Sequence, residues 1–149
     1  MKLVAGTLLF LLCALVGEGK NRSLVRRERT LLQLHVLIRE IGERQLSGLV
    51  SFREAVLRCP PSPEQEQLLI LAQGKEAEMP LLTAEERAAL TAYVRSESRS
   101  LEALRSERDS LLGLLQKELD RTREELSRKG QVCRSVGYLC GAAALLLVL

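Results

Sequence analysis

The chain contains 149 residues, enough for one domain of ordinary size and for no more than two. Aromatic residues make up 3% of it and charged residues 28%, and leucine and alanine are abundant, so the composition favours an all-α fold over a fold that contains a β-sheet. The formal net charge is only +3, with acidic and basic residues interleaved, which argues against a nucleic-acid-binding surface.

The first apolar stretch runs from Leu3 to Val16 and contains no charged side chain. It has the length and the charged start of a secretory signal peptide, but no A-x-A cleavage site follows it. As a retained transmembrane anchor, residues 1–19, it is short: about 21 Å of helix against about 30 Å of hydrocarbon. Local thinning of the bilayer absorbs a mismatch of this size at modest cost.

Basic residues after this stretch indicate how it is oriented. Lysine and arginine are frequent between Lys20 and Arg29, whereas only Lys2 and the amino terminus precede the stretch. The positive-inside rule therefore places the residues from Lys20 onward in the cytoplasm. A cleaved signal peptide would put the same basic segment on the other side of the membrane. We predict a retained anchor, with a cleaved signal peptide as the alternative.

The middle of the chain, residues 20–131, is predicted to be a cytoplasmic helical domain. Apolar residues at helical spacing indicate a first helix from about Ser23 to Leu46, which Ser47 and Gly48 end. The residues of its apolar face are Leu31, Leu34, Leu37, Ile38, Ile41 and Leu46. This face is expected to lie in the core of a helical bundle.

Two short helices are expected next. Ser51 and Glu54 have the spacing of a capping box, which predicts that Ser51 begins the first of them. Ser62 is a suitable N-cap for the second, because Pro63 then takes the first helical position. Gly74 is placed to be the C′ residue that ends the second helix.

The last third of the chain is predicted to form one unbroken helix from Thr83 to Lys129. Thr83 and Glu86 have capping-box spacing at its start. Its apolar stripe comprises Leu90, Val94, Leu101, Leu104, Leu111, Leu115 and Leu119. Such a helix would be about 70 Å long, more than twice the thickness of a bilayer core, so most of it must lie outside the membrane. The shorter helices are expected to fold against part of it.

The C-terminal segment, residues 132–149, is predicted to be a second transmembrane anchor. From Ser135 to Leu149 it contains no charged side chain. The basic residues at the expected membrane boundary are Arg128, Lys129 and Arg134. Gly137 and Gly141 have the GxxxG spacing that lets another helix approach closely, so they are candidates for helix packing; a pair without any role is an equally open interpretation.

No motif in the sequence indicates catalytic chemistry. The only histidine, His35, lies among aliphatic residues and has no nucleophile that the sequence assigns to it. The four cysteines lack metal-ligand spacing, and glycine-rich phosphate loops are absent. The paired carboxylates lie on a predicted helix among arginines, and Glu124 and Glu125 stand four residues before Arg128 and Lys129, which is ordinary helix support. We therefore expect no enzyme, no cofactor or metal, no nucleic acid and no small-molecule substrate.

A longer pattern runs from the end of the predicted long helix into the C-terminal segment. It has the form K-G-x-x-x-R-S-x-G-x-L-x-G and comprises Lys129, Gly130, Arg134, Ser135, Gly137, Leu139 and Gly141. This pattern resembles the one that closes stage III sporulation protein AB of endospore-forming bacteria. The start of the chain is similar as well, with a short apolar segment followed by an arginine-rich stretch.

Polar positions in the middle of the chain extend this resemblance. Glu43 fits the first glutamate of an E-x-E before Gly48, and Glu54 stands in the place of the glutamate in a P-L-P-E-A-L segment. Ser96 and Glu97 take the place of the S-D pair in a G-x-S-D-x-x-x-Q segment, although the flanking glycine and glutamine are replaced. The resemblance implies that Glu43, Glu54, Ser96 and Glu97 are partner-docking candidates.

The family implies an interaction protein without chemistry of its own. Its cytoplasmic domain would be similar to that of the platform proteins of type II secretion and type IV pilus machines. The chain would then be a scaffold of the mother cell–forespore channel, in the mother-cell membrane facing the forespore. Its partners would be the stage III sporulation AA ATPase, other membrane proteins of the channel and the lipid bilayer. The alternative is an exported coiled-coil envelope protein with a cleaved signal peptide and one C-terminal anchor.

Overall fold

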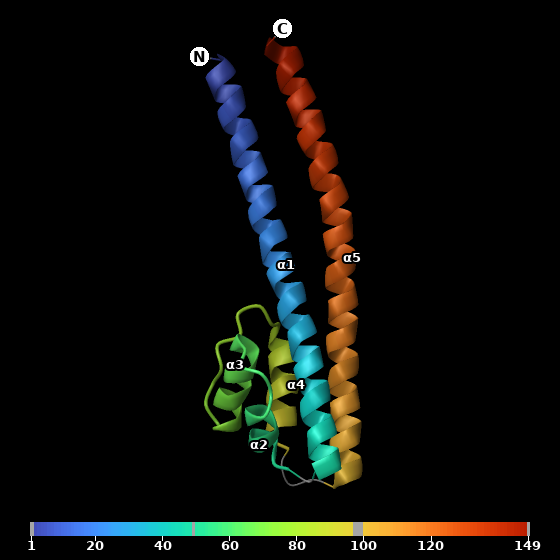
Figure 1. The fold of residues 1–149 in the computed structure, drawn as a ribbon. Helices are drawn as coiled ribbons and strands as arrows, with labels where there is room; N and C mark the ends of the chain where they lie inside the picture. The colour runs from blue at the N-terminus through green and yellow to red at the C-terminus, as the bar shows by residue number, and fades with distance from the viewer. Residues whose placement is uncertain (1, 49, 97–99, 149) are drawn as a thin grey trace. The chain divides into compact units, whose positions relative to one another are not determined.

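The computed structural model describes residues 2–48, 50–96 and 100–148, and the side chains of residues 2–18, of residue 20 and of most residues beyond 129 lie outside that description. The elements are helices α1 (Lys2–Gly48), α2 (Phe52–Leu57), α3 (Pro63–Ala72), α4 (Ala84–Val94) and α5 (Leu101–Val148) (Figure 1). No strand occurs among the described residues. The prediction of an all-α fold is therefore confirmed.

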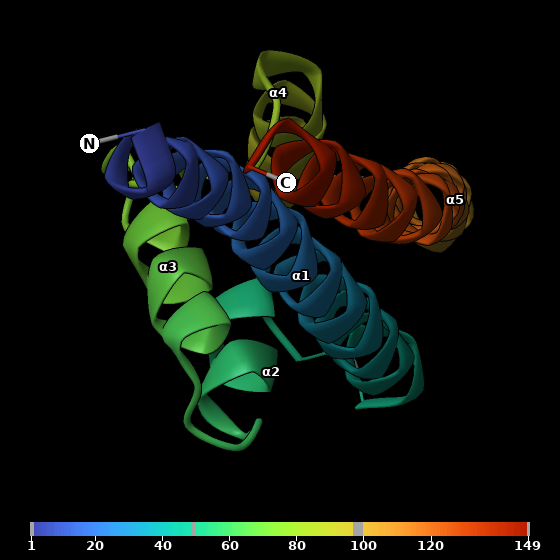
Figure 2. The same ribbon diagram turned by 90° about the horizontal axis from the view of Figure 1, so that it is seen from above.

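The helices belong to two compact units. Arg27–Asp120 form the first unit, which we term the bundle, and Met1–Arg26 with Arg121–Leu149 form the second, the terminal unit. Helices α1 and α5 each contribute residues to both units. Within the bundle, α2 and α3 lie beside each other on one side of α1 (Figure 2).

The core of the bundle is mainly aliphatic. The predicted apolar face of α1 is confirmed from Leu31 to Ile41, where its residues are buried, whereas its last predicted member, Leu46, is only partly buried. The buried hydrophobic residues are Leu31, Leu34, Leu37, Ile38, Ile41, Phe52, Ala55, Val56, Cys59, Leu68, Leu71, Met79, Leu82, Leu90, Tyr93, Val94, Leu111, Leu115 and Leu119. They come from all five helices and from the loops, and their burial is the main favourable contribution to folding.

The predicted unbroken helix from Thr83 to Lys129 is wrong. Helix α4 ends at Val94, and α5 begins at Leu101. Ser96 closes the first of these helices, because both its hydroxyl, at 2.7 Å, and its backbone N–H, at 3.3 Å, donate to the Tyr93 carbonyl oxygen. A serine side chain that bonds nearby backbone in this way competes with the helical hydrogen bonds.

A new helix start follows this turn. The Ser100 hydroxyl accepts a hydrogen bond from the Ala103 backbone N–H at 3.3 Å, as an N-cap side chain does. The break also changes the predicted apolar stripe. Leu101 is 48% exposed, whereas Leu111, Leu115 and Leu119 are buried as expected.

The helix ends in the middle of the chain are governed by local capping. The side chains of Ser51 and Ser62 accept from the backbone N–H three residues further on, which confirms both as N-caps. Gly74 has φ +77°, its N–H bonds the Leu71 carbonyl, and the Lys75 N–H bonds the Ile70 carbonyl. This is a Schellman motif, for which glycine is favoured because it lacks a Cβ.

Two details of the sequence prediction need correction. The Glu54 carboxylate was expected to complete a capping box, but it accepts from Arg58 Nη2 at 2.7 Å. Helix α1 was expected to begin near Ser23, but its backbone is helical from Lys2 onward. Its predicted end near Gly48 is confirmed.

The terminal unit contains the two predicted membrane anchors, residues 1–19 and 132–149. Both fall largely on side chains that lie outside the description, so the anchors stay predictions. Among the described residues, no helix has the length and apolar character that crossing a membrane requires.

Candidate functional site

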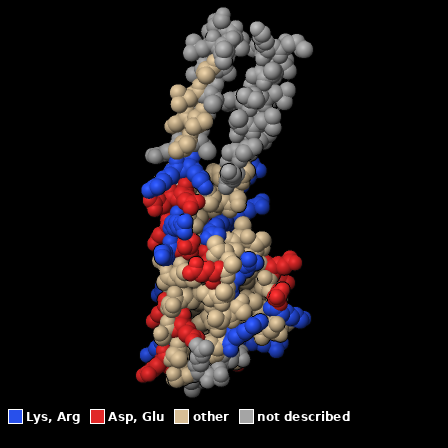
Figure 3. Space-filling view, turned by 180° about the vertical axis from the view of Figure 1, so that it is seen from behind, with Lys and Arg blue, Asp and Glu red and all other residues tan. Residues whose placement is uncertain are grey.

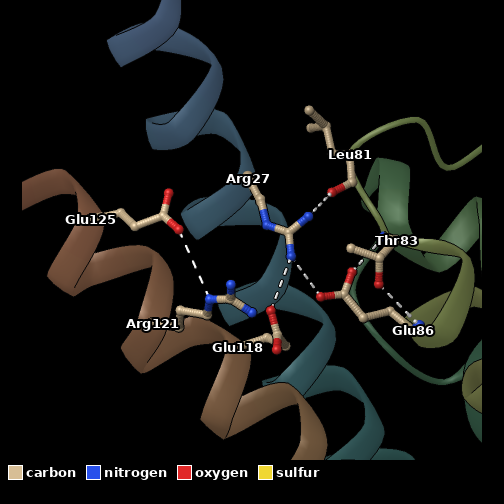
Figure 4. Close-up of polar contacts among 7 residues, drawn as sticks. All are labelled: Arg27, Leu81, Thr83, Glu86, Glu118, Arg121 and Glu125. Atoms are coloured by element: carbon tan, nitrogen blue, oxygen red, sulfur yellow. Dashed lines mark hydrogen bonds and ion pairs between the residues drawn. The ribbon is translucent and has the colours of Figure 1, made fainter. Parts of the chain in front are cut away.

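Arg27 lies at the centre of a polar cluster in the bundle. Its Nη2 donates to Glu86 Oε1 at 2.7 Å and to Glu118 Oε2 at 3.3 Å, and its Nη1 donates to the Leu81 carbonyl oxygen at 3.0 Å (Figure 4). The side chains of Arg27 and Glu118 are 21% and 18% exposed, whereas that of Glu86 is only 1% exposed. The cluster joins α1 to α4, to α5 and to the loop before α4.

Glu86 combines two structural roles. Its Oε2 accepts from the Thr83 backbone N–H at 2.7 Å, and the Thr83 hydroxyl accepts from the Glu86 N–H at 3.2 Å, which confirms the predicted capping box (Figure 4). Its other oxygen binds Arg27. Because both oxygens have partners and the side chain is buried, the geometry favours a structural role over proton transfer.

A second buried cluster surrounds Tyr93. Its ring lies edge-to-face against Phe52, with the centroids 5.9 Å apart and an interplanar angle of 82°. Its hydroxyl donates to Gln45 Oε1 at 3.3 Å. Burial raises the pKa of the Tyr93 phenol to about 12, while the nearby Arg108 guanidinium acts in the opposite direction.

This shift predicts that the bundle loses stability in alkali. The unfolded chain releases the Tyr93 proton near pH 10.0 and the folded chain near pH 12, so the stabilisation is complete below pH 10.0 and is lost as the pH rises to about 12. The loss is about 2–3 kcal/mol by proton linkage. Urea unfolding across this pH range should show it in the wild type. The Tyr93→Phe variant should lack this part of the decline in stability. Equal declines in the wild type and in this variant would contradict the role of the Tyr93 phenol in it.

The end of α2 is joined to α3 by a buried amide. Gln65 Nε2 donates to the carbonyl oxygens of Val56, at 2.9 Å, and Cys59, at 3.1 Å. The Cys59 thiol is itself buried and donates to the Ala55 carbonyl oxygen at 3.4 Å. Burial raises the pKa of the Cys59 thiol, and the Glu40 carboxylate adds to this effect, while Arg44 opposes it. A buried thiol with a raised pKa is a poor nucleophile.

A groove opens on the bundle between α4 and the loop that follows α3, with a volume of about 590 Å³. Its floor consists of the buried side chains of Leu71, Met79 and Leu90. Small residues of α4, namely Ala88, Thr91 and Ala92, line one wall. Three exposed cations, Lys75, Arg87 and Arg95, stand at the rim together with one carboxylate, Glu76. Sequence reasoning missed the groove.

The docking candidates that the resemblance implied lie in different settings. Glu43 is exposed and forms an ion pair with Arg39 at 3.2 Å, and Glu54 is exposed and paired with Arg58. Ser96 is buried in the turn that ends α4. Glu97 lies outside the described residues. Among those that are described, no hydrogen bond or ion pair joins any two of these candidates.

The predicted boundary residues lie in the terminal unit. Arg128 and Lys129 are exposed and pair with Glu124, at 2.7 Å, and Glu125, at 3.5 Å. Arg121 also pairs with Glu125, at 3.9 Å (Figure 4). The side chain of Arg134 lies outside the description, as do the surroundings of Gly137 and Gly141.

An exposed apolar stripe follows the boundary on α5. Val132, Val136 and Leu139 are 59%, 50% and 70% exposed, and Ala143 is exposed as well. Steps of four, three and four residues place these side chains on one face of the helix. On the face that Figure 3 shows, charged side chains of both signs are interleaved over the described part of the bundle. The described side chains of the α5 segment from Val132 onward carry neither sign.

Among the residues that the structure describes, no group of histidine, cysteine, aspartate and glutamate is arranged to hold a metal ion. Comparisons of the chain with models of protein families, with curated proteins and with solved structures found no match.

Proposed function

We propose that the chain is a non-enzymatic membrane scaffold. Residues 1–19 and 132–149 hold it at a membrane, and residues 20–131 present a helical docking surface in the cytoplasm. The observation that carries this proposal is the apolar stripe of α5, which is exposed and directly follows the ion-paired cations Arg128 and Lys129. An apolar helix face that water would contact favours a lipid or protein environment, and flanking cations favour the headgroup region.

The resemblance to stage III sporulation protein AB adds a more specific proposal. The membrane would be the mother-cell membrane facing the forespore, and the bundle would correspond to the cytoplasmic domain of secretion and pilus platform proteins. The partner would be the stage III sporulation AA ATPase, together with other membrane proteins of the same channel. Buried polar clusters at Arg27 and Tyr93 support a contact role, because their polar groups are engaged in holding helices together.

Membrane fractionation tests the scaffold. The wild-type chain should remain with the membranes after an alkaline carbonate wash, and removal of residues 2–19 and 132–149 together should release it. Once solubilised in detergent, the full chain should copurify with the AA ATPase. The matched control is Leu32→Arg with Val36→Arg, because these side chains are also apolar and exposed but belong to the bundle. This control should stay with the membranes. A washed-off wild-type chain would contradict the proposal.

A topology measurement separates this scaffold from the exported alternative. Cys59 is buried and therefore unsuitable as a probe, so a cysteine is placed at the exposed Glu78. A membrane-impermeant maleimide should label this cysteine only after the cells are permeabilised. Labelling in intact cells, with a mature chain that lacks the first apolar stretch, would favour an exported envelope protein.

A further inference from the structure

We propose that the groove between α4 and the loop after α3 binds an acidic segment of a partner protein. One apolar side chain of the segment would pack on Leu71, Met79 and Leu90, and carboxylates beside it would pair with the cations at the rim. The proposal rests on the docking role proposed above, because it names the surface and the chemistry of the partner.

The charges at the rim are complementary to such a segment. Arg87 lies on α4, and Arg95, eight residues further on, is the C-cap residue of this helix, which separates their Cα atoms by about 12 Å along the helix axis. Lys75 reaches the groove from the opposite loop, and Glu76 is the single carboxylate in the lining.

Many other surface charges pair within their own helix, as Arg39 does with Glu43. Arg87, Arg95 and Lys75, in contrast, form no ion pair with any residue that the structure describes. Guanidinium groups bind carboxylates in a bidentate manner, which provides both affinity and orientation.

The shape and floor of the groove favour a peptide over a simple anion. Ala88, Thr91 and Ala92 leave room between the two arginines, and the volume of about 590 Å³ is within the range of ligand sites. The floor is apolar, so a purely anionic ligand would leave it in contact with water. An apolar side chain would instead bury it, and the unbranched Met79 can adapt to different shapes. A peptide that carries both features uses the whole groove.

Fluorescence anisotropy with the full chain in detergent micelles tests this inference. The probe is a short fluorescent peptide in which glutamates flank a central leucine. We expect binding that weakens with added salt and a loss of at least about tenfold in affinity for Arg87→Glu with Arg95→Glu. Ala88→Trp keeps every charge but fills the groove, and it should weaken binding as well.

The matched control is Arg53→Glu with Arg105→Glu, which makes the same change in net charge at exposed arginines outside the groove. It should alter the affinity less than about twofold. Circular dichroism of each variant confirms that it is folded. Any of three results would overturn the proposal. These are a wild type that does not bind the peptide, double variants that both lose affinity equally, and a peptide with lysine in place of glutamate that binds as tightly as the acidic one.

A lipid ligand is the remaining outcome. The double variant Arg87→Glu with Arg95→Glu could lose binding to phosphatidylglycerol vesicles and still bind the peptide as the wild type does. This result would assign the cations to lipid and overturn the peptide site. The peptide assay contains no membrane, so its failure would leave the membrane scaffold standing. Failure of the fractionation test would likewise leave the peptide result intact.

Discussion

Replacing Arg27 by methionine is expected to lower the free energy of unfolding of the bundle by about 3–5 kcal/mol, which is typical when one partner of a buried ion pair is removed. The variant leaves the Glu86 carboxylate, 1% exposed, with the Thr83 backbone N–H as its remaining described partner. The Leu81 carbonyl oxygen also loses its hydrogen bond. Urea unfolding followed by circular dichroism measures the change.

Two further variants make this result specific. Arg39→Met removes an ion pair of which both side chains are more than half exposed, so it should change the free energy of unfolding by less than about 0.5 kcal/mol. Arg27→Met with Glu86→Met removes both charges and should be less destabilised than the sum of the two single variants. Additive effects in this cycle would show that Arg27 and Glu86 do not depend on each other. Equal effects of Arg27→Met and Arg39→Met would contradict the large destabilisation expected for the buried pair.

Local features of the fold were predictable from the sequence because the residues responsible are close together along the chain. Thr83 and Glu86 form their capping box within one helical turn, and Gly74 ends α3 through its own backbone conformation. The apolar face of α1 was predictable for the same reason, since helical periodicity alone determines which residues share a face.

The break between α4 and α5 was missed because the apolar spacing continues across it. Val94 and Leu101 are seven residues apart, which places them on one face of a continuous helix and hides an interruption. The local signal in the sequence was the serine at every second position from 96 to 100. The hydroxyls of Ser96 and Ser100 bond backbone at the end of one helix and the start of the next. Weighing these serines against the stripe would have predicted the turn.

The clusters and the groove were out of reach of sequence reasoning for a different reason. Arg27 meets Glu86 and Glu118 across 59 and 91 residues of sequence, so neither pairing follows from local spacing. The groove depends on how the loop after α3 lies along α4, which is a property of packing. Its one sequence signal was the pair of arginines at positions 87 and 95, which have the small residues Ala88, Thr91 and Ala92 between them.

Replacing Phe52 by alanine is expected to lower the free energy of unfolding by about 3–5 kcal/mol, the usual range for removing a buried phenylalanine side chain. Phe52 is 2% exposed and packs edge-to-face on Tyr93. Helix α2 has only six residues, too few to be stable alone, so it depends on the packing of Phe52, Ala55 and Val56. The variant should therefore loosen α2 before it unfolds the whole bundle.

The thiol of Cys59 reports this local opening. It is 5% exposed in the wild type and lies just beyond α2, so a maleimide should react with it slowly in the native protein and faster in Phe52→Ala. Leu57→Ala is the matched control, because Leu57 belongs to the same helix but is 59% exposed. It should alter the free energy of unfolding by less than about 0.5 kcal/mol. Labelling rates that rise equally in both variants would mean that the packing of Phe52 is not what holds α2 on the bundle. Faster labelling in Phe52→Ala alone would mean that one aromatic side chain fixes α2, and through the Gln65 hydrogen bonds also the adjoining end of α3, on the bundle.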